Sequence, residues 1–446
     1  MNNRNPEISK GIDWSLIGIY LLLVSIGLMA IFAATYQEGE PVMQSFLRFK
    51  TDYSKQFYFF VVGAVIALFI LLTDSKFFSA TANLGYAMGI FFLILVFPFH
   101  SPIKGTESII KLGAFNFQPA EFCKIFVALA LAKYLSRPDT EFTKTRSQLI
   151  ATAIALFPAA LTIMQKETGL ALVYFAFFIV MFREGLPSVV LVIGFALAAL
   201  VVATLLFEKI TLALILVCLT ILVILLMRRL IRRRRGLLMG IILTGIVCIG
   251  IQYLAVPFAF KHLLKYYQIE RIYNTVGRDV PEEYVLAHAD ELKKSGGKKK
   301  DPNYNVKQSK IAIGSGGLFG KGLLKSTQTR YGFVPEQRTD FIFDTIAEGF
   351  GFAGSFVLLA VYLLLLFRIV TIAERQRSVF SRCYAYGVAG VFFFHIAINI
   401  AMTAGLAPVI GIPLPFISYG GTSLLTFTIM LFILIRLDAD RQMVLR

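Results

Sequence analysis

Residues 308–344 read QSKIAIGSGGLFGKGLLKSTQTRYGFVPEQRTDFIFD, and this stretch decides how the rest of the chain can fold. It is polar, rich in glycine and basic in its middle, whereas most of the sequence around it is apolar. Lipid cannot satisfy the backbone groups of such a segment, so the stretch must lie outside the hydrocarbon or be buried against protein. It is therefore the first place to look for an active site.

The composition indicates an integral membrane protein. Of the 446 residues, 57% are hydrophobic and 16% are charged, against about 25% charged residues in soluble domains. The net charge of +17 does not indicate nucleic-acid binding, because its densest part, six arginines within residues 228–235, lies between two apolar runs. That placement is typical of a cytoplasmic anchor. The cysteines and histidines show no metal-ligand spacing, so they predict no metal site.

The apolar runs predict an all-α polytopic membrane protein with about 10–12 transmembrane helices, each near the roughly 20 residues that a bilayer requires. A large extracytoplasmic loop is expected before the third-last helix. The predicted parts are N-terminal helices in 1–258 (with an extra helix pair within 187–227), the loop with the catalytic segment at 259–340, and C-terminal helices in 341–446. The individual runs are approximately 14–35, 56–73, 82–99, 119–136, 149–164, 169–183, 187–207, 209–227, 237–258, 341–367, 383–404 and 421–437.

The charges of the short loops predict the orientation. Basic side chains gather in alternate connections, such as the six-arginine cluster and residues 368–382. Short cytoplasmic loops carry this excess, so both termini are expected in the cytoplasm and residues 259–340 outside. Within that long loop, the lysine-rich residues 284–304 are expected to form a mobile surface insertion.

A second unusual segment, residues 405–421, reads GLAPVIGIPLPFISYGG. Its prolines and glycines are incompatible with a continuous helix. We expect a broken or re-entrant segment that returns toward the polar stretch.

Three carboxylates near the end of the polar stretch are the first candidates for chemistry. Asp340 is expected to open a helix, and Asp344 and Glu348 follow at spacings of four residues, which would place all three on one helix face. Ionisable groups at membrane depth are costly and usually face a cavity or a partner. The alternative role for Asp340 alone is a helix cap. Basic residues suited to a polyphosphate lie just upstream, at Lys321, Lys325, Arg330 and Arg338.

Glu121 and Lys124 form a second polar pair at the end of a predicted span. They are three residues apart and therefore share a helix face. Either they form an ion pair that only stabilises packing, or they provide the polar floor of a cavity beneath the loops. The glycine-rich sequences at 314–317 and 320–322 resemble phosphate-binding loops but match no nucleotide-binding signature.

Taken together, these motifs resemble the SEDS family of cell-wall polymerases (shape, elongation, division and sporulation proteins). The resemblance covers most of the chain and is nearer to the rod-shape elongation branch, RodA, than to the division branch, FtsW. Its motifs are Asp13-Trp14, FQPAEFCK at 117–124, QSKIAIGSGGLFGKG at 308–322, TQT at 327–329, VPEQRTDFIF at 334–343 and GIPLPFISYGG at 411–421.

The resemblance implies a peptidoglycan glycosyltransferase of the bacterial cytoplasmic membrane. Such an enzyme polymerises lipid II, with Asp340 as general base and undecaprenyl pyrophosphate as leaving group. It works beside a class B penicillin-binding protein and other membrane proteins of the elongation complex. No cofactor is required by the sequence, although Mg²⁺ or Mn²⁺ could assist departure of the pyrophosphate. The residues assigned to substrate binding are Glu121, Lys124, Gln118, Lys321, Gln328, Arg330, Arg338, Ser418 and Tyr419.

The chain departs from the family pattern in several places. A GARRWI-like segment is GTESII at 105–110, and a QPDLGTA-like turn is QKETGLA at 165–171. Further differences are Ser326 for a glycine, Arg338 for a histidine and Gly349 for a glutamate. These changes affect expected contacts more than the class of activity.

Two other functions are compatible with the residues. The carboxylates at 340, 344 and 348 could form a proton or ion path in a transporter or flippase for a lipid-linked precursor. The chain could also be a scaffold for a penicillin-binding protein, in which case Asp340 would be dispensable.

Overall fold

The computed structural model describes residues 11–441 except 37–41, 48, 50, 102–106, 113–114, 234, 265, 276–277 and 290–303. The polypeptide packs as two compact units, residues 1–186 with 305–446, and residues 187–304. These units follow packing rather than membrane sidedness, so the three segments predicted from topology stay a prediction. Most of the lysine-rich insertion predicted at 284–304 lies outside the described residues.

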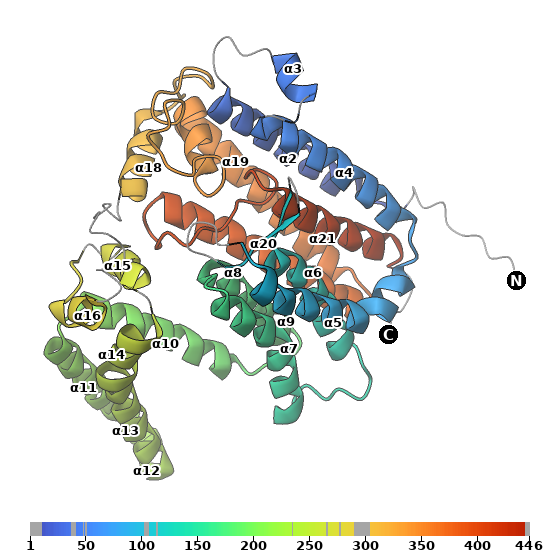
Figure 1. Cartoon of the computed structure of the whole chain (residues 1–446). Helices are drawn as coiled ribbons and strands as arrows, with labels where there is room; N and C mark the ends of the chain where they lie inside the picture. The colour runs from blue at the N-terminus through green and yellow to red at the C-terminus, as the bar shows by residue number, and fades with distance from the viewer. Residues whose placement is uncertain are drawn as a thin grey trace, which may run out of the picture. The chain divides into compact units, whose positions relative to one another are not determined.

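The first unit is a helical bundle with a two-stranded hairpin (Figure 1). The hairpin pairs β1 (Ile110–Leu112) with β2 (Phe115–Phe117) in antiparallel register. The helices are α2 (Trp14–Thr35), α3 (Val42–Leu47), α4 (Asp52–Leu72), α5 (Ser75–Phe99), α6 (Pro119–Leu135), α7 (Thr145–Met164), α8 (Thr168–Val173), α9 (Phe177–Arg183), α18 (Tyr304–Ser315), α19 (Ile342–Glu374), α20 (Val379–Thr403) and α21 (Gly421–Ala439).

The second unit contains a long helical hairpin and shorter helices. Its two predicted extra spans are both helical, as α10 and α11. The helices are α10 (Ser188–Leu206), α11 (Lys209–Leu226), α12 (Arg228–Arg233), α13 (Arg235–Gly250), α14 (Val256–Phe258), α15 (Tyr266–Thr275) and α16 (Glu282–Ala287).

The prediction of a polytopic all-α membrane protein is confirmed. Among the described residues, ten helices are long and apolar enough to cross a membrane. The 17-residue helix α6 and the apolar segment Thr168–Arg183 are shorter. The predicted 10–12 spans therefore all correspond to helices.

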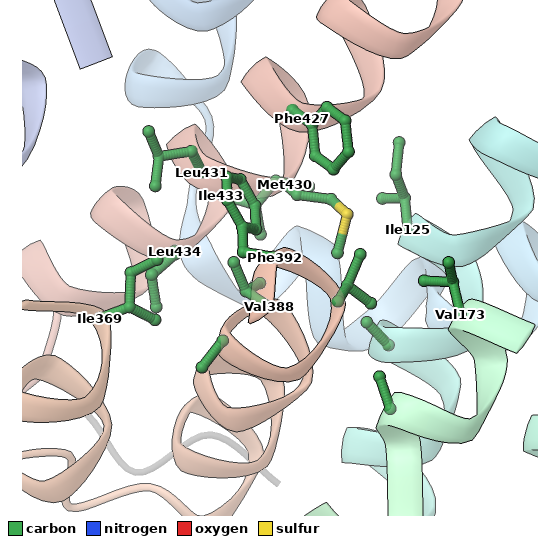
Figure 2. Close-up of a cluster of buried hydrophobic side chains, with 14 of the residues drawn as sticks. Ile125, Val173, Ile369, Val388, Phe392, Phe427, Met430, Leu431, Ile433 and Leu434 are labelled. Carbon is green, nitrogen blue, oxygen red and sulfur yellow. The ribbon is translucent and has the colours of Figure 1, made fainter. Parts of the chain in front are cut away.

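Close packing of aromatic and aliphatic side chains holds α19, α20 and α21 against α6 and α8 (Figure 2). At the centre, Phe392 of α20 meets Phe427 of α21 edge-to-face, with ring centroids 5.1 Å apart. Helices in lipid associate mainly through such packing, because the lipid tails are as apolar as the side chains. Glycine allows the tightest approach: a Cβ at Gly27 of α2 would lie 2.7 Å from the Cα of Ile417.

Ion pairs link the start of α2 to the ends of α19 and α21. Asp13 caps α2 by accepting a hydrogen bond from the N–H of Leu16, and it also pairs with Arg368 and Arg375 of the α19 end. Arg375 continues the chain to Asp438 at the end of α21. Burial alone would raise the pKa of Asp13, but the hydrogen bonds from Arg368, Leu16 and Arg375 together hold this pKa below its usual range.

Helix α19 is broken at Gly351, which has a φ of 67° and a ψ of −159°. The glycine-rich loop 316–322 docks at the break, where two of its N–H groups donate to the carbonyls of Glu348 and Gly349 at 3.0 and 2.9 Å. A Cβ at Gly320 would lie 2.1 Å from the carbonyl oxygen of Gly349. Of the glycines that resemble a phosphate-binding loop, Gly316 and Gly320 thus allow close backbone packing.

Candidate active site

Asp340 was predicted to open a helix, but it lies in a turn two residues before the start of α19. It therefore does not continue the helix face of Asp344 and Glu348. The side chain of Asp340 is half-buried, whereas Asp344 and Glu348 are fully buried. The expectation that all three carboxylates lie along one helix face is wrong, because α19 begins only at Ile342.

The segment 404–420 is non-helical and lies against this turn, as predicted for a segment that returns to the polar stretch. The hydroxyl of Ser418 donates to the carbonyl of Thr339 at 2.6 Å. The N–H of Tyr419 donates to the carbonyl of Arg338 at 2.8 Å. The two motifs VPEQRTDFIF and GIPLPFISYGG are far apart in the sequence. Through these hydrogen bonds they meet in the structure directly beside Asp340.

Asn399 of α20 forms hydrogen bonds to both of these segments. Its side-chain amide donates to the carbonyl of Asp340 at 2.8 Å and to the carbonyl of Ile412 at 2.7 Å. Next to this contact, a Cβ at Gly411 would lie 3.3 Å from Oδ2 of Asp340, and Gly411 has a φ of 78°. Glycine at this position therefore leaves room around the carboxylate.

Side chains of helix α4 also contact both segments at the turn. Gln56 donates to the carbonyl of Ser418 at 3.2 Å and accepts from the N–H of Gly420 at 3.1 Å. Asp52 forms an ion pair with Arg338. Burial, and then the charge of Asp52 together with its hydrogen bond, raise the pKa of Tyr419 to about 12. The phenol is thus a neutral hydroxyl beside the turn at physiological pH.

Both segments that meet at Asp340 contain a non-glycine residue in the left-handed region. Glu336 has a φ of 57° and Phe416 has a φ of 66°. Such conformations cost on the order of 1–3 kcal/mol each and persist where the surroundings hold them. Their presence on both sides of Asp340 marks this turn as a tightly specified part of the molecule.

Glu348 holds a second polar cluster, built on the TQT motif. Its carboxylate accepts hydrogen bonds from the backbone N–H groups of Thr327, Gln328 and Thr329 at 2.8, 2.9 and 2.9 Å. Lys321 donates to the same carboxylate at 3.0 Å. Two residues assigned to substrate binding, Lys321 and Gln328, therefore contribute to the anchoring of the loop on α19.

Replacing Glu348 by glutamine is expected to loosen the TQT loop. An uncharged amide with one acceptor oxygen cannot replace a carboxylate that accepts three backbone N–H bonds, and hydrogen bonds to a charged group contribute about 1.5–3 kcal/mol. We expect local protection of the amides at 327–329 to fall by about 2–3 kcal/mol, or roughly 30–150-fold faster hydrogen exchange. Glu141→Gln, at an exposed glutamate, is the control, and unchanged exchange in Glu348→Gln would contradict this role.

Glu121 and Lys124 form a buried ion pair with 2.7 Å between the charged atoms. Nζ of Lys124 also lies 2.7 Å from Nε2 of His395 in α20. Nδ1 of His395 donates to the carbonyl of Pro413 at 3.0 Å. A hydrogen-bonded chain therefore runs from α6 through α20 to the segment that contacts Asp340. All three ionisable side chains are at most 1% exposed. The assignment of Glu121 and Lys124 to substrate binding stays a prediction.

Sequence reasoning gave no role to His395 and overlooked Asn399. The available signal was their spacing of four residues in an apolar span, which places two polar side chains on one face at membrane depth. Of the other assigned residues, Gln118 lies 3.4 Å from the hydroxyl of Ser108, and Arg330 donates to the carbonyl of Leu324.

The two departures from the family pattern at 105–110 and 165–171 contact each other. Glu107 forms an ion pair with Lys166. The hydroxyl of Ser108 donates to Oε2 of Glu167 at 2.8 Å. The altered residues of one segment are thus matched by altered residues of the other.

The divalent cation predicted as an aid to the leaving group stays a prediction. In the part of the chain that the structure describes, no three His, Cys, Asp or Glu side chains are grouped to hold a metal ion. The two buried carboxylates nearest the turn are engaged, Asp344 with Ser309 and Glu348 with the TQT loop. We therefore derive no step through a metal.

The chain matches known proteins over nearly all its length. The pattern of the cell cycle protein family FTSW_RODA_SPOVE matches residues 13–216 and 207–443. The peptidoglycan glycosyltransferase RodA of Treponema pallidum is 32% identical, over 96% of this chain and 97% of its own. The peptidoglycan glycosyltransferase MrdB of Escherichia coli K12 is 30% identical, over 86% of this chain and 84% of its own.

Solved structures share the fold. The rod shape determining protein RodA of Thermus thermophilus superimposes with a TM-score of 0.60 at 22% identity, over 97% of this chain and 98% of its own. A chain of a peptidoglycan synthase complex that coordinates polymerization and crosslinking gives a TM-score of 0.63 at 24% identity, over 96% of this chain and 98% of its own. With ten apolar spans in the part of the chain that the structure describes, and a family pattern matched from residue 13 to residue 443, this multi-pass membrane protein belongs to the FtsW/RodA/SpoVE family of cell cycle proteins.

Proposed function

We propose that this chain is a peptidoglycan glycosyltransferase that polymerises lipid II into glycan strands during cell elongation. The observation that carries the proposal is the meeting of two family motifs at Asp340, where Ser418, Tyr419 and Asn399 hold the backbone of the turn. The carboxylate remains half-buried. The activity is the one named for the relatives from Treponema and Escherichia.

In the proposed reaction, Asp340 acts as general base. It takes the proton from the 4-hydroxyl of the N-acetylglucosamine of one substrate, and that oxygen attacks the anomeric carbon of the other. The bond to undecaprenyl pyrophosphate breaks with inversion, and the pyrophosphate carries away the electron pair. A base held at hydrogen-bond reach of its substrate accelerates such a transfer by about 10²–10⁴-fold.

Nearby cations would stabilise the developing charge on the pyrophosphate. Arg338 is the best placed, because it is two residues from Asp340 and its side chain is 52% exposed. Lys321 is 31% exposed beside the TQT loop. Each would exchange part of its present ion pair for the substrate.

We place the site at the outer face of the cytoplasmic membrane, with both termini in the cytoplasm. The charges of the short loops support this orientation. We further propose a class B penicillin-binding protein as partner, together with membrane proteins of the elongation complex. A solved relative from a complex that couples polymerization to crosslinking supports that pairing.

The transporter alternative is less well supported, since Asp344 accepts a hydrogen bond from Ser309 and Glu348 accepts hydrogen bonds from the TQT loop. The deciding experiment measures glycan formation from labelled lipid II by the purified protein, with and without its cognate penicillin-binding protein. We expect a ladder of glycan products. Absence of product with the partner present, together with transfer of the lipid-linked precursor across vesicle membranes, would favour the transporter.

A further inference from the structure

The second unit has a groove that no part of the proposed function uses. It lies between α11 and α13 and has a volume of about 410 Å³, within the range of roughly 300–1,000 Å³ that is typical of small-molecule sites. Its wall includes Leu219, Val223, Leu237 and Ile241. The hydroxyls of the two lining threonines donate to carbonyls of their own helices, so the wall is apolar in character.

Glycines set the shape of this groove. Where Gly245 meets Thr220, a Cβ would lie 2.7 Å from the threonine hydroxyl, so the two helices are in close contact there. At Gly240 and Gly236, further toward the start of α13, a Cβ would have nothing within 4 Å. The groove is therefore narrow at Gly245 and has free space at Gly240 and Gly236, toward the connection between α11 and α13.

That connection is the arginine-rich helix α12. Arg228, Arg229 and Arg232 are exposed, and no residue in the described part of the chain forms an ion pair with them. Of the groove's lining residues, Val223 comes five residues before Arg228 and Gly236 comes four residues after Arg232. The apolar groove is thus flanked along the chain by three exposed cations that have no ion-pair partner among the described residues.

We propose that this groove binds one anionic membrane phospholipid, with an acyl chain along the glycine face of α13 and the phosphate at the arginines of α12. A zwitterionic lipid matches the apolar wall but not the net charge of three cations. Basic residues beside the membrane favour anionic headgroups, and basic pockets between transmembrane helices are known places for them. This inference concerns the second unit alone and does not depend on the proposed enzymatic activity.

The test measures lipid binding to the purified full-length protein. Native mass spectrometry records the bound lipid while phosphatidylglycerol or phosphatidylethanolamine is titrated. We expect saturable binding of phosphatidylglycerol at one site. The triple variant Arg228→Gln, Arg229→Gln and Arg232→Gln should bind it about 100-fold more weakly, from about fivefold per arginine. A triple variant of equal charge at other exposed arginines (Arg137→Gln, Arg146→Gln and Arg377→Gln) should bind as wild type does.

A second pair of variants tests the groove itself. Gly240→Leu fills the open channel without a backbone clash and should weaken binding at least tenfold, whereas Gly194→Leu, at an exposed glycine of α10 with equal space, should not. Equal binding of both lipids, or wild-type binding in either the arginine triple variant or Gly240→Leu, would overturn the proposal. A dimer in the same spectra that disappears in Gly240→Leu would show that a second copy occupies the groove instead.

Discussion

Replacing Asp340 by asparagine is expected to lower glycan polymerisation by about 10²–10⁴-fold, the usual contribution of a general base. Asparagine has nearly the same shape but cannot accept the proton of the attacking hydroxyl. The contacts made by Asn399, Ser418 and Tyr419 are to backbone carbonyls of the turn and do not involve the carboxylate. These three contacts should therefore persist in the variant, and the loss should appear in the chemical step.

The measurement is the rate of lipid II consumption by wild type and Asp340→Asn at equal amounts of folded protein and equal binding of the penicillin-binding protein. Asp139→Asn, at an exposed aspartate, provides the matched control. Polymerisation at the wild-type rate in Asp340→Asn would remove Asp340 as the base while leaving the assigned family untouched. A variant that fails to bind the partner would instead show that the turn has a structural role.

Replacing Lys124 by methionine should produce the largest loss of stability. The carboxylate of Glu121 would stay buried without its cation, and one of its oxygens, Oε1, already has no hydrogen-bond partner among the described residues. Breaking a buried ion pair by removing one partner costs about 3–5 kcal/mol. We expect the free energy of unfolding in detergent to fall by that amount.

A double variant separates the pair from its surroundings. Glu121→Gln with Lys124→Met removes both charges and should recover most of the lost stability, because no isolated charge remains. Lys144→Met removes a lysine with the same i, i+3 spacing from Glu141, but in a pair that is 62–66% exposed. That control should change stability by less than about 1 kcal/mol. A double variant as unstable as Lys124→Met would contradict the argument.

The spans were predictable because their apolar length is a property of local sequence. Their ends were less so: α4 begins at Asp52, four residues before the predicted run, since its first turn is polar yet still helical. The break of α19 at Gly351 is occupied by the loop 316–322, which precedes Gly351 by about 30 residues in the sequence. Hydropathy carries no information about such an insertion.

The site was predictable in part. Asp340, Arg338, Ser418 and Tyr419 meet, because the motifs that contain them fold onto one another. Glu348 was singled out as one of three carboxylates on a helix face. Its partners include backbone N–H groups of residues 327–329, which no side-chain pattern reveals.

The matched departures at Glu107 and Lys166 have a consequence for how this branch of the family can evolve. In the family pattern, arginine occupies the place of Glu107, so restoring it alone would set it against Lys166. The effects of mutations at the two positions are therefore expected to be coupled, because the charge at each position changes the effect of a replacement at the other.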